Sequence, residues 1–148
     1  MTYTMGDTNQ ILVIEDDPDT QDILCDILSD AGYSPMSALD GEQGLELAQN
    51  SQPGLILLDL MLPGIDGVEV CRRLSSNDAT RSIPVIVLTA RNELPVKLSS
   101  FMAGAKRFLT KPFESDTLLN EISRTFRQAH ISSEHHGLNG HPGLDPRD

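Results

Sequence analysis

Short, unbroken runs of apolar residues recur along this chain, and each run stops at a polar or charged residue. The clearest are ILVI at 11–14, LILL at 55–58 and IPVIVL at 83–88, with weaker runs at 33–37 and 106–110. A strand that is apolar on both faces needs cover on both faces, which is the environment of a parallel sheet between helical layers. The pattern predicts an α/β fold with a doubly wound, five-stranded parallel sheet.

Helix signals fill the gaps between these runs. Asp17 precedes Pro18, a good cap and first residue for a helix, and Asp40 has Gln43 three residues on, the form of a capping pair. The expected helix starts are Asp17, Asp40, Asp66, a position within 93–103 that places Pro95 in the first turn, and residue 114. Five helices therefore alternate with the five strands.

The net charge of −11 is unevenly distributed. All 11 Lys and Arg lie at or beyond Arg72, whereas 14 of the 22 acidic residues precede it. A phosphate backbone needs a basic face, so the acidic first half argues against a nucleic-acid groove and is compatible with a cation site.

The ends of the chain differ in composition from its centre. All four histidines lie in 130–148, a segment without a periodic apolar face, which predicts a disordered tail or linker remnant. Residues 1–9 form an expected N-terminal extension without the basic start of a signal peptide, which favours the cytosol. The centre has no histidine, which excludes Ser-His-Asp and Cys-His chemistry there. Cys25 and Cys71 are expected to be free thiols.

Polar residues of a specific kind follow the strands. Glu15 and Asp16 follow the first, Asp59 the third, Thr89 ends the fourth, and Lys111 follows the fifth. Because the carboxyl ends of parallel strands share one edge, these groups can converge. Crowded carboxylates need a cation, and oxygen-only ligands suit Mg²⁺. Carboxylates, a hydroxyl, a lysine and Mg²⁺ are the parts of a phosphoryl-transfer site, with Asp59 as nucleophile.

Four motifs in register give the chain a resemblance. "ILVIEDDP", "LILLDLMLPGIDG", "PVIVLTA" and "AGAKRFLTKPF" together resemble the receiver domain of two-component response regulators. The resemblance covers roughly residues 10–129 and implies a flavodoxin-like, CheY-like sheet in the order 2-1-3-4-5, flanked by five helices.

The resemblance assigns roles to residues of this chain. Asp59 is the expected phosphoacceptor. Lys111, ahead of a cis bond to Pro112, is expected to pair with the phosphoryl group. Thr89 is the expected switch hydroxyl, and Phe108 the aromatic rotamer switch.

The resemblance also implies a metal site. Asp16 is expected to contact Mg²⁺ directly and Glu15 mainly through water, with Asp59 and the backbone carbonyl of Met61 as further ligands. The acidic pair is Glu-Asp rather than the commoner Asp-Asp, which lengthens one arm. Asp17 offers a shifted alternative pair, but the register with "ILVI" favours Glu15 and Asp16.

Two other departures bear on output and lifetime. Lys106 and Arg107 stand where acidic residues are common, which predicts either a partner with an acidic patch or only a solvated edge. Met61 and Arg91 flank the path of the hydrolytic water, and neither is an evident base. A persistent phosphoryl group is therefore expected.

The expected function is a signalling switch rather than an enzyme. A histidine kinase or phosphotransfer protein phosphorylates Asp59, and the surface of the fourth helix, fifth strand and fifth helix then controls a partner or output domain. The chain is expected to be a monomer or a phosphorylation-dependent dimer, with no membrane or direct nucleic-acid contact. Two alternatives are a haloacid-dehalogenase-type phosphatase, which needs an Asp where Met61 stands, and a phosphate-independent, receiver-like interaction module.

Overall fold

The computed structural model describes residues 9–139, and five parallel strands form its single sheet. The strand order is β2-β1-β3-β4-β5, which confirms the predicted α/β fold. The strands are β1 (Gln10–Ile14), β2 (Ser34–Ala38), β3 (Leu55–Leu58), β4 (Val85–Thr89) and β5 (Arg107–Thr110). The order reverses between β1 and β3, so the topological switch point lies at the carboxyl ends of these two strands.

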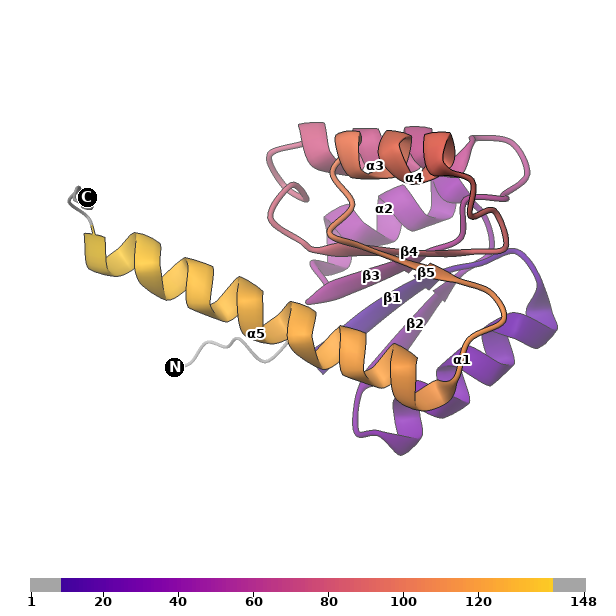
Figure 1. The fold of residues 1–148 in the computed structure, drawn as a ribbon, viewed down its shortest axis with the longest axis horizontal. Coiled ribbons are helices and arrows are strands. Elements are labelled where there is room, and N and C mark those ends of the chain that lie inside the picture. The colour runs from indigo at the N-terminus through magenta and orange to yellow at the C-terminus, as the bar shows by residue number, and fades with distance from the viewer. Residues whose placement is uncertain (1–8, 140–148) are drawn as a thin grey trace.

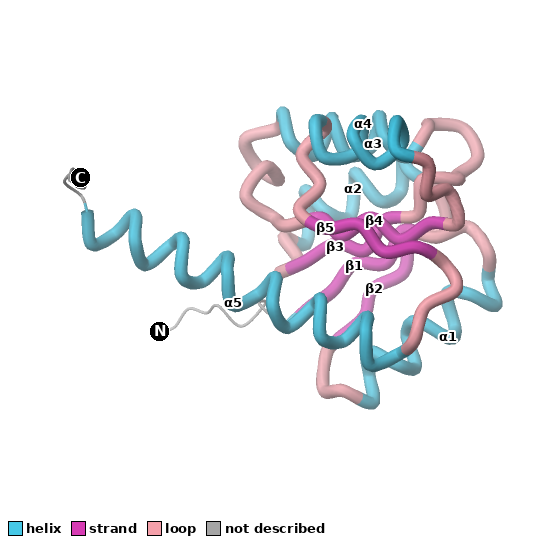
Figure 2. Tube along the Cα trace, in the orientation of Figure 1, coloured by secondary structure: helices cyan, strands magenta, loops and turns pink. Residues whose placement is uncertain are grey.

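The helices cover both faces of the sheet (Figure 1). Helices α1 and α5 lie on one face, and α2, α3 and α4 lie on the other, as the tube view also shows (Figure 2). Their bounds are α1 (Pro18–Asp30), α2 (Gly41–Ser51), α3 (Gly67–Ser76), α4 (Leu94–Met102) and α5 (Ser115–Asn139).

Successive residues of each central strand pack into opposite layers. In β1, Leu12 and Ile14 pack beneath α2 and α3, whereas Ile11 and Val13 pack beneath α1 and α5. Strands β3 and β4 follow the same alternation, so their unbroken apolar runs fill both layers of the core. Both faces of these strands are therefore covered up to the edge where the polar residues emerge.

Most helix starts have the predicted chemistry. The Asp17 carboxylate accepts a hydrogen bond from the Thr20 N–H at 3.0 Å, and Asp40 accepts one from the Gln43 N–H at 2.8 Å. Pro95 lies in the first turn of α4, as expected. Asp66 stands at the cap position of α3 but its side chain makes no capping hydrogen bond.

Helix α5 extends past the expected boundary of the receiver domain at residue 129. It continues to Asn139, into the segment expected to be a disordered tail or linker remnant. Extending a nucleated helix requires no new nucleus, so these residues can continue it without a periodic apolar face. The C-terminal half of α5 projects away from the sheet (Figure 1). The rest of the predicted tail, and all of the N-terminal extension except Asn9, lie outside the described residues.

Neither cysteine forms a disulfide. Both are free, with Cys71 buried in α3 and Cys25 half-buried in α1, as predicted. Among the described residues, no helix combines the length and apolar character needed to cross a membrane.

Candidate functional site

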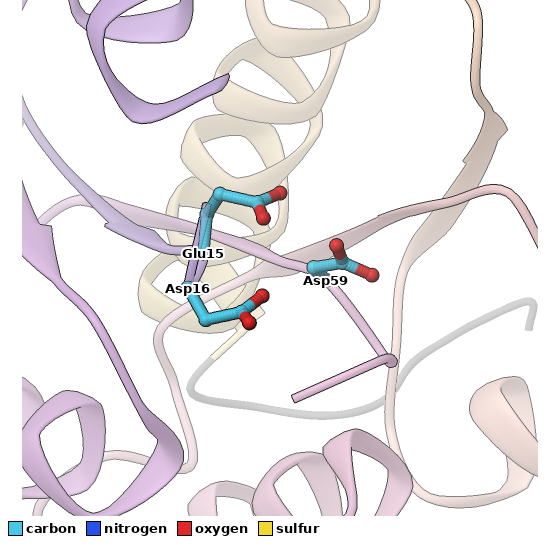
Figure 3. Close-up of side chains that lie close together, drawn as sticks. All are labelled: Glu15, Asp16 and Asp59. Atoms are coloured by element: carbon cyan, nitrogen blue, oxygen red, sulfur yellow. The ribbon is translucent and has the colours of Figure 1, made fainter. Parts of the chain in front are cut away.

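Glu15, Asp16 and Asp59 lie together at the carboxyl edge of the sheet (Figure 3). Glu15 and Asp16 follow β1, and Asp59 follows β3, which pairs with β1. One carboxylate oxygen from each residue lies within 4.8 Å of the other two. Glu15 and Asp59 are 3% and 7% exposed, whereas Asp16 is exposed. The switch point of the sheet therefore holds an acidic pocket that is open on one side.

Lys111 reaches this pocket from the end of β5. Its Nζ donates to Glu15 Oε1 at 2.7 Å and to Asp59 Oδ2 at 2.9 Å. Burial lowers the pKa of Lys111, but the hydrogen bonds to Glu15 and Asp59 more than offset it, so the pKa is raised above its usual value. The lysine is therefore held as a cation between two carboxylates. The bond from Lys111 to Pro112 is cis, as the resemblance implied.

The Asp59 carboxylate is held at both oxygens. Oδ2 accepts from Lys111, and Oδ1 accepts from the Met61 backbone N–H at 2.9 Å. The backbone loop behind it closes through a hydrogen bond from the Gly67 N–H to the Leu60 carbonyl at 3.1 Å. The side chain therefore has a defined orientation toward the pocket.

The surroundings of Glu15 shift the pKa of its carboxyl group. Burial raises its pKa above the ordinary value, and hydrogen bonds from Lys111 and from the Asp17 N–H, the latter at 3.1 Å, offset part of that rise. The nearby Asp59 raises it further. The pocket holds more negative charge than Lys111 alone neutralises.

The donor set fits a hard divalent cation. Its groups are carboxylate oxygens, with one exposed member that leaves room for water, and no sulfur or imidazole belongs to the cluster. Mg²⁺ prefers such oxygen ligands and retains several waters. Glu15, Asp16 and Asp59 are therefore suited to hold Mg²⁺.

Thr89 lies in β4 and Phe108 in β5, the neighbouring strand. Thr89 is fully buried, and its hydroxyl oxygen accepts from the Arg91 N–H at 3.4 Å. Phe108 is half-buried in β5, with its ring centroid 6.5 Å from that of Phe101 and 5.6 Å from the Lys97 Nζ. Thr89 is the last residue of β4, at the carboxyl edge of the sheet, whereas Phe108 contacts α4.

The basic residues Lys106 and Arg107 differ in their surroundings. The Arg107 guanidinium pairs with Glu121 at 3.1 Å and donates to Thr125 at 2.9 Å and Gln128 at 2.8 Å, all on α5. Lys106 is exposed. Only Lys106 therefore remains available to an acidic partner at this point.

One buried polar residue of the site region was missed by the sequence reasoning. Gln21 is 4% exposed on α1, and its side-chain amide contacts the backbone at the ends of β1 and β2. A signal was present, because Gln21 occupies the same face of α1 as the buried Leu24 and Leu28.

Comparisons with known proteins agree with this geometry. The family model described as "Response regulator receiver domain" matches residues 11–123. The transcriptional regulator RpaA of Synechocystis sp., described as DNA-binding, is 43% identical over 119 residues, which cover 80% of this chain and 49% of the relative. The chain spans about half the length of the curated relatives it matches.

Solved receiver structures superpose closely. A CheY-like response regulator receiver domain protein from Methanospirillum hungatei JF-1 has a TM-score of 0.79 and 26% identity, covering 84% of this chain and 98% of its own. The receiver domain of the sensor histidine kinase PA1611 from Pseudomonas aeruginosa PAO1 has a TM-score of 0.75 and 30% identity, covering 80% and 97%. That structure holds a magnesium ion in its active-site cleft.

The fold and site define a class of signalling domain, in which a parallel α/β sheet ends in an acidic pocket closed by a lysine. The chain belongs to the response regulator receiver domain family, the phosphorylation-dependent components of two-component signalling.

Proposed function

We propose that Asp59 is the phosphoryl acceptor of this receiver domain, and that a histidine kinase or phosphotransfer protein in the cytosol is the donor. The observation that carries the proposal is the hydrogen bonding of the Asp59 carboxylate. One oxygen accepts from Lys111 and the other from the Met61 N–H, inside the acidic pocket. The proposal extends to this chain the role that its family gives to an aspartate at this position.

The transfer is a substitution at phosphorus. An oxygen of Asp59 forms a bond to phosphorus, the bond from phosphorus to the donor's histidine nitrogen breaks, and that nitrogen keeps the electron pair. Lys111 already lies 2.9 Å from Asp59 Oδ2, so its ammonium is placed to stay beside the phosphoryl oxygens. The chain thus acts as a substrate that assists its own phosphorylation, not as an enzyme with turnover.

The proposed metal ligands are Asp16, Glu15 mainly through water, Asp59 and the Met61 carbonyl. A bound Mg²⁺ would supply positive charge to the phosphoryl oxygens during transfer. The residues present support this assignment, because three carboxylates gather in one pocket and Lys111 is engaged by two of them.

The proposed switch runs through Thr89 and Phe108. A phosphoryl group on Asp59 can shift an equilibrium only through contacts that differ between two states. Thr89 is buried at the end of the neighbouring strand, which supports its hydroxyl as the group that gains such a contact. Phe108 packs against Phe101 of α4, so its movement would change the surface formed by α4, β5 and α5. That surface is the proposed site of output, through a protein partner, an output domain or dimerisation.

A groove beside the pocket supports a protein donor. It is about 450 Å³ and lies between α1 and the segment from Lys111 to Ser115. Its lining includes Ile23 of α1, which is 58% exposed, together with Phe113 and Lys111 itself. A helix of the donor seated there would cover an edge of the phosphorylation pocket.

A slow loss of the phosphoryl group follows from the side chains at the pocket mouth. Met61 is 55% exposed and offers no base, and Arg91 is paired with Glu93 at 3.4 Å. Neither can take a proton from an attacking water. A lifetime of only seconds would contradict this part of the proposal.

The testing experiment is intact-protein mass spectrometry after incubation with Mg²⁺ and acetyl phosphate. Wild type is expected to gain one phosphoryl group, and Asp59→Asn none. Asp66→Asn is the matched control, because Asp66 is an exposed carboxylate on the same loop without a capping hydrogen bond. It should be phosphorylated like wild type.

The opposite result has a defined meaning. A folded wild type that gains no phosphoryl group from acetyl phosphate or from phosphorylated histidine proteins would contradict the proposal. It would favour the phosphate-independent interaction module instead.

A further inference from the structure

The side-chain amide of Gln21 joins the ends of two strands. Its Nε2 donates to the carbonyls of Val13 at 2.8 Å, Ala38 at 3.0 Å and Glu15 at 3.2 Å. Its Oε1 accepts from the Ser37 hydroxyl at 2.9 Å. Because all three partners of the nitrogen are carbonyls, the orientation of the amide is fixed by its surroundings. A buried glutamine with both polar atoms satisfied is a specific structural device.

The hydrogen bond to Glu15 matters because of where that carbonyl lies. This carbonyl belongs to the planar peptide unit that also contains the Asp16 nitrogen. A hydrogen bond that fixes the carbonyl therefore fixes the orientation of the whole peptide plane between Glu15 and Asp16. The other side of Glu15 is held as well, since its N–H donates to the Ala38 carbonyl at 3.0 Å. Gln21 donates to that same Ala38 oxygen. The backbone before Asp16 is therefore restrained just beyond the last residue of β1.

Asp16 depends on this restraint more than its neighbours do. The carboxylates of Glu15 and Asp59 are buried and tied to Lys111, whereas Asp16 is exposed. Three carboxylates within 4.8 Å repel one another, and an exposed one can swing into water unless its backbone holds it.

We propose that Gln21 is a positioning residue of the acidic site. It fixes the peptide between Glu15 and Asp16 and so places the Asp16 carboxylate for a divalent cation before the cation binds. The inference rests on the proposed function, because it assumes that this pocket binds Mg²⁺. Gln21 lies outside the pocket, and its loss weakens Mg²⁺ binding although every proposed metal ligand remains.

The test is an NMR titration of the full chain with Mg²⁺, which gives a dissociation constant. Gln21→Met keeps the length and helix propensity of the side chain but removes its donors. The dissociation constant is expected to rise about 10-fold, the lower end of what loss of a supporting residue costs a metal site. In wild type without metal, the Gln21 side-chain NH₂ should exchange slowly with solvent, a signature that needs no bound ion.

Two control variants separate positioning from stability. Ser37→Ala removes a partner of the Gln21 oxygen but leaves the three carbonyl contacts, so the dissociation constant should stay within about twofold of wild type. Leu28→Ala destabilises the same helix from its fully buried face and should also leave Mg²⁺ binding unchanged. If Gln21→Met does not fold, Gln21→Asn, which keeps the amide but is too short to reach, takes its place with the same expected rise.

The outcomes separate this inference from the proposed function. Equal Mg²⁺ affinity in wild type and the folded Gln21 variant would overturn the role of Gln21 and leave the phosphorylation site intact. A wild type without saturable Mg²⁺ binding would overturn the metal site itself, and this inference with it. A comparable loss of affinity in Leu28→Ala would also overturn it, because general destabilisation would then suffice.

Discussion

The Lys111 Nζ lies 2.9 Å from Asp59 Oδ2, although two helices (α3 and α4) and two strands (β4 and β5) separate the two residues in sequence. The same nitrogen lies 2.7 Å from Glu15 Oε1. This single ammonium is the counter-ion of two nearly buried carboxylates, so the metal-free pocket depends on it. The contact is therefore both part of the proposed chemistry and part of the stability of the fold.

Replacing Lys111 by Met should destabilise the metal-free protein at pH 7 by about 2 kcal/mol. The variant leaves Glu15 and Asp59 without their shared cation, and the partial exposure of the lysine limits the cost. Urea unfolding in the presence of a chelator measures it. Saturating Mg²⁺ should recover part of the loss, because a cation then replaces the ammonium. Lys106→Met, at an exposed lysine one strand away, should change the free energy of unfolding by less than about 0.5 kcal/mol.

The same variant has a predictable pH dependence. The raised pKa of Lys111 in the fold means that its contribution is fully present below the ordinary lysine value of 10.5 and is lost as the pH rises through the folded value. At the acid end, the raised pKa of Glu15 means that its carboxylate takes a proton at higher pH than usual, and the need for a counter-ion then falls. The deficit of Lys111→Met should therefore be largest near neutral pH and shrink toward pH 4 and above 10.5. A deficit that grows on acidification would contradict this account.

Gly67 should tolerate no side chain. A Cβ there would lie 2.4 Å from the Leu60 Cα and 2.8 Å from the Asp59 carbonyl oxygen, both backbone atoms that cannot turn away. Gly67→Ala is expected to cost about 2 kcal/mol or more and to slow phosphorylation of Asp59, because the loop behind the acceptor must shift. The matched variant is Gly64→Ala on the same loop, where φ is +75° and a Cβ meets open space. It should cost about 1 kcal/mol, from conformation alone, and leave the phosphorylation rate unchanged. Equal rates in the two variants would contradict the steric argument.

The parts of the site that could be predicted are those fixed by strand ends. Once the unbroken apolar runs imply a parallel sheet, Glu15, Asp59, Thr89 and Lys111 must share an edge whatever the details of the loops. That inference needs only the order of the strands along the chain and the spacing of their apolar residues. The acidic pocket and its contact with Lys111 confirm it.

The parts that could not be predicted depend on which side chains meet across helices. The sequence alone does not show that the Gln21 side chain donates hydrogen bonds to the carbonyls of Val13 and Ala38. Nor does the sequence show that Arg107 forms an ion pair with Glu121 of α5. Both are tertiary pairings: the helical period places Gln21 on the buried face of α1, but it does not identify the partners of either side chain. The continuation of α5 past residue 129 is likewise not predicted by the sequence, because this segment has no periodic apolar face.

Cys71 should make the fold less stable in alkali. Burial raises the pKa of its thiol to about 11, so the unfolded chain ionises first and stability falls as the pH rises from about 9 toward 11. The loss from this one group should reach roughly 2 to 3 kcal/mol over that window. Cys71→Ala should therefore lose less stability than wild type between pH 8 and pH 10.5, as measured by urea unfolding. Leu74→Ala, a fully buried change in the same helix without an ionisable group, should follow the wild-type pH dependence.

Helix α4 exposes several large apolar side chains to solvent. Its large exposed side chains are Leu94, Leu98, Phe101 and Met102. Apolar surface of this kind marks a contact site, and it lies next to Phe108, the proposed switch residue. The double variant Leu98→Gln with Met102→Gln should fold with wild-type stability within about 1 kcal/mol and accept a phosphoryl group normally.

The same double variant should weaken the association that phosphorylation promotes, raising its dissociation constant by about 10-fold. The apolar side chains of Leu98 and Met102 are removed from contact with water when the complex forms, and glutamine loses that gain. Sedimentation of the phosphorylated protein at several concentrations measures this for a dimer. Ile23→Gln is the control, since Ile23 is 58% exposed but lies on α1, across the sheet from α4. It should leave association unchanged. If Ile23→Gln weakens association and the α4 variant does not, the output surface lies on the other face. If phosphorylated wild type stays monomeric, dimerisation is excluded and the α4 face must serve a different protein.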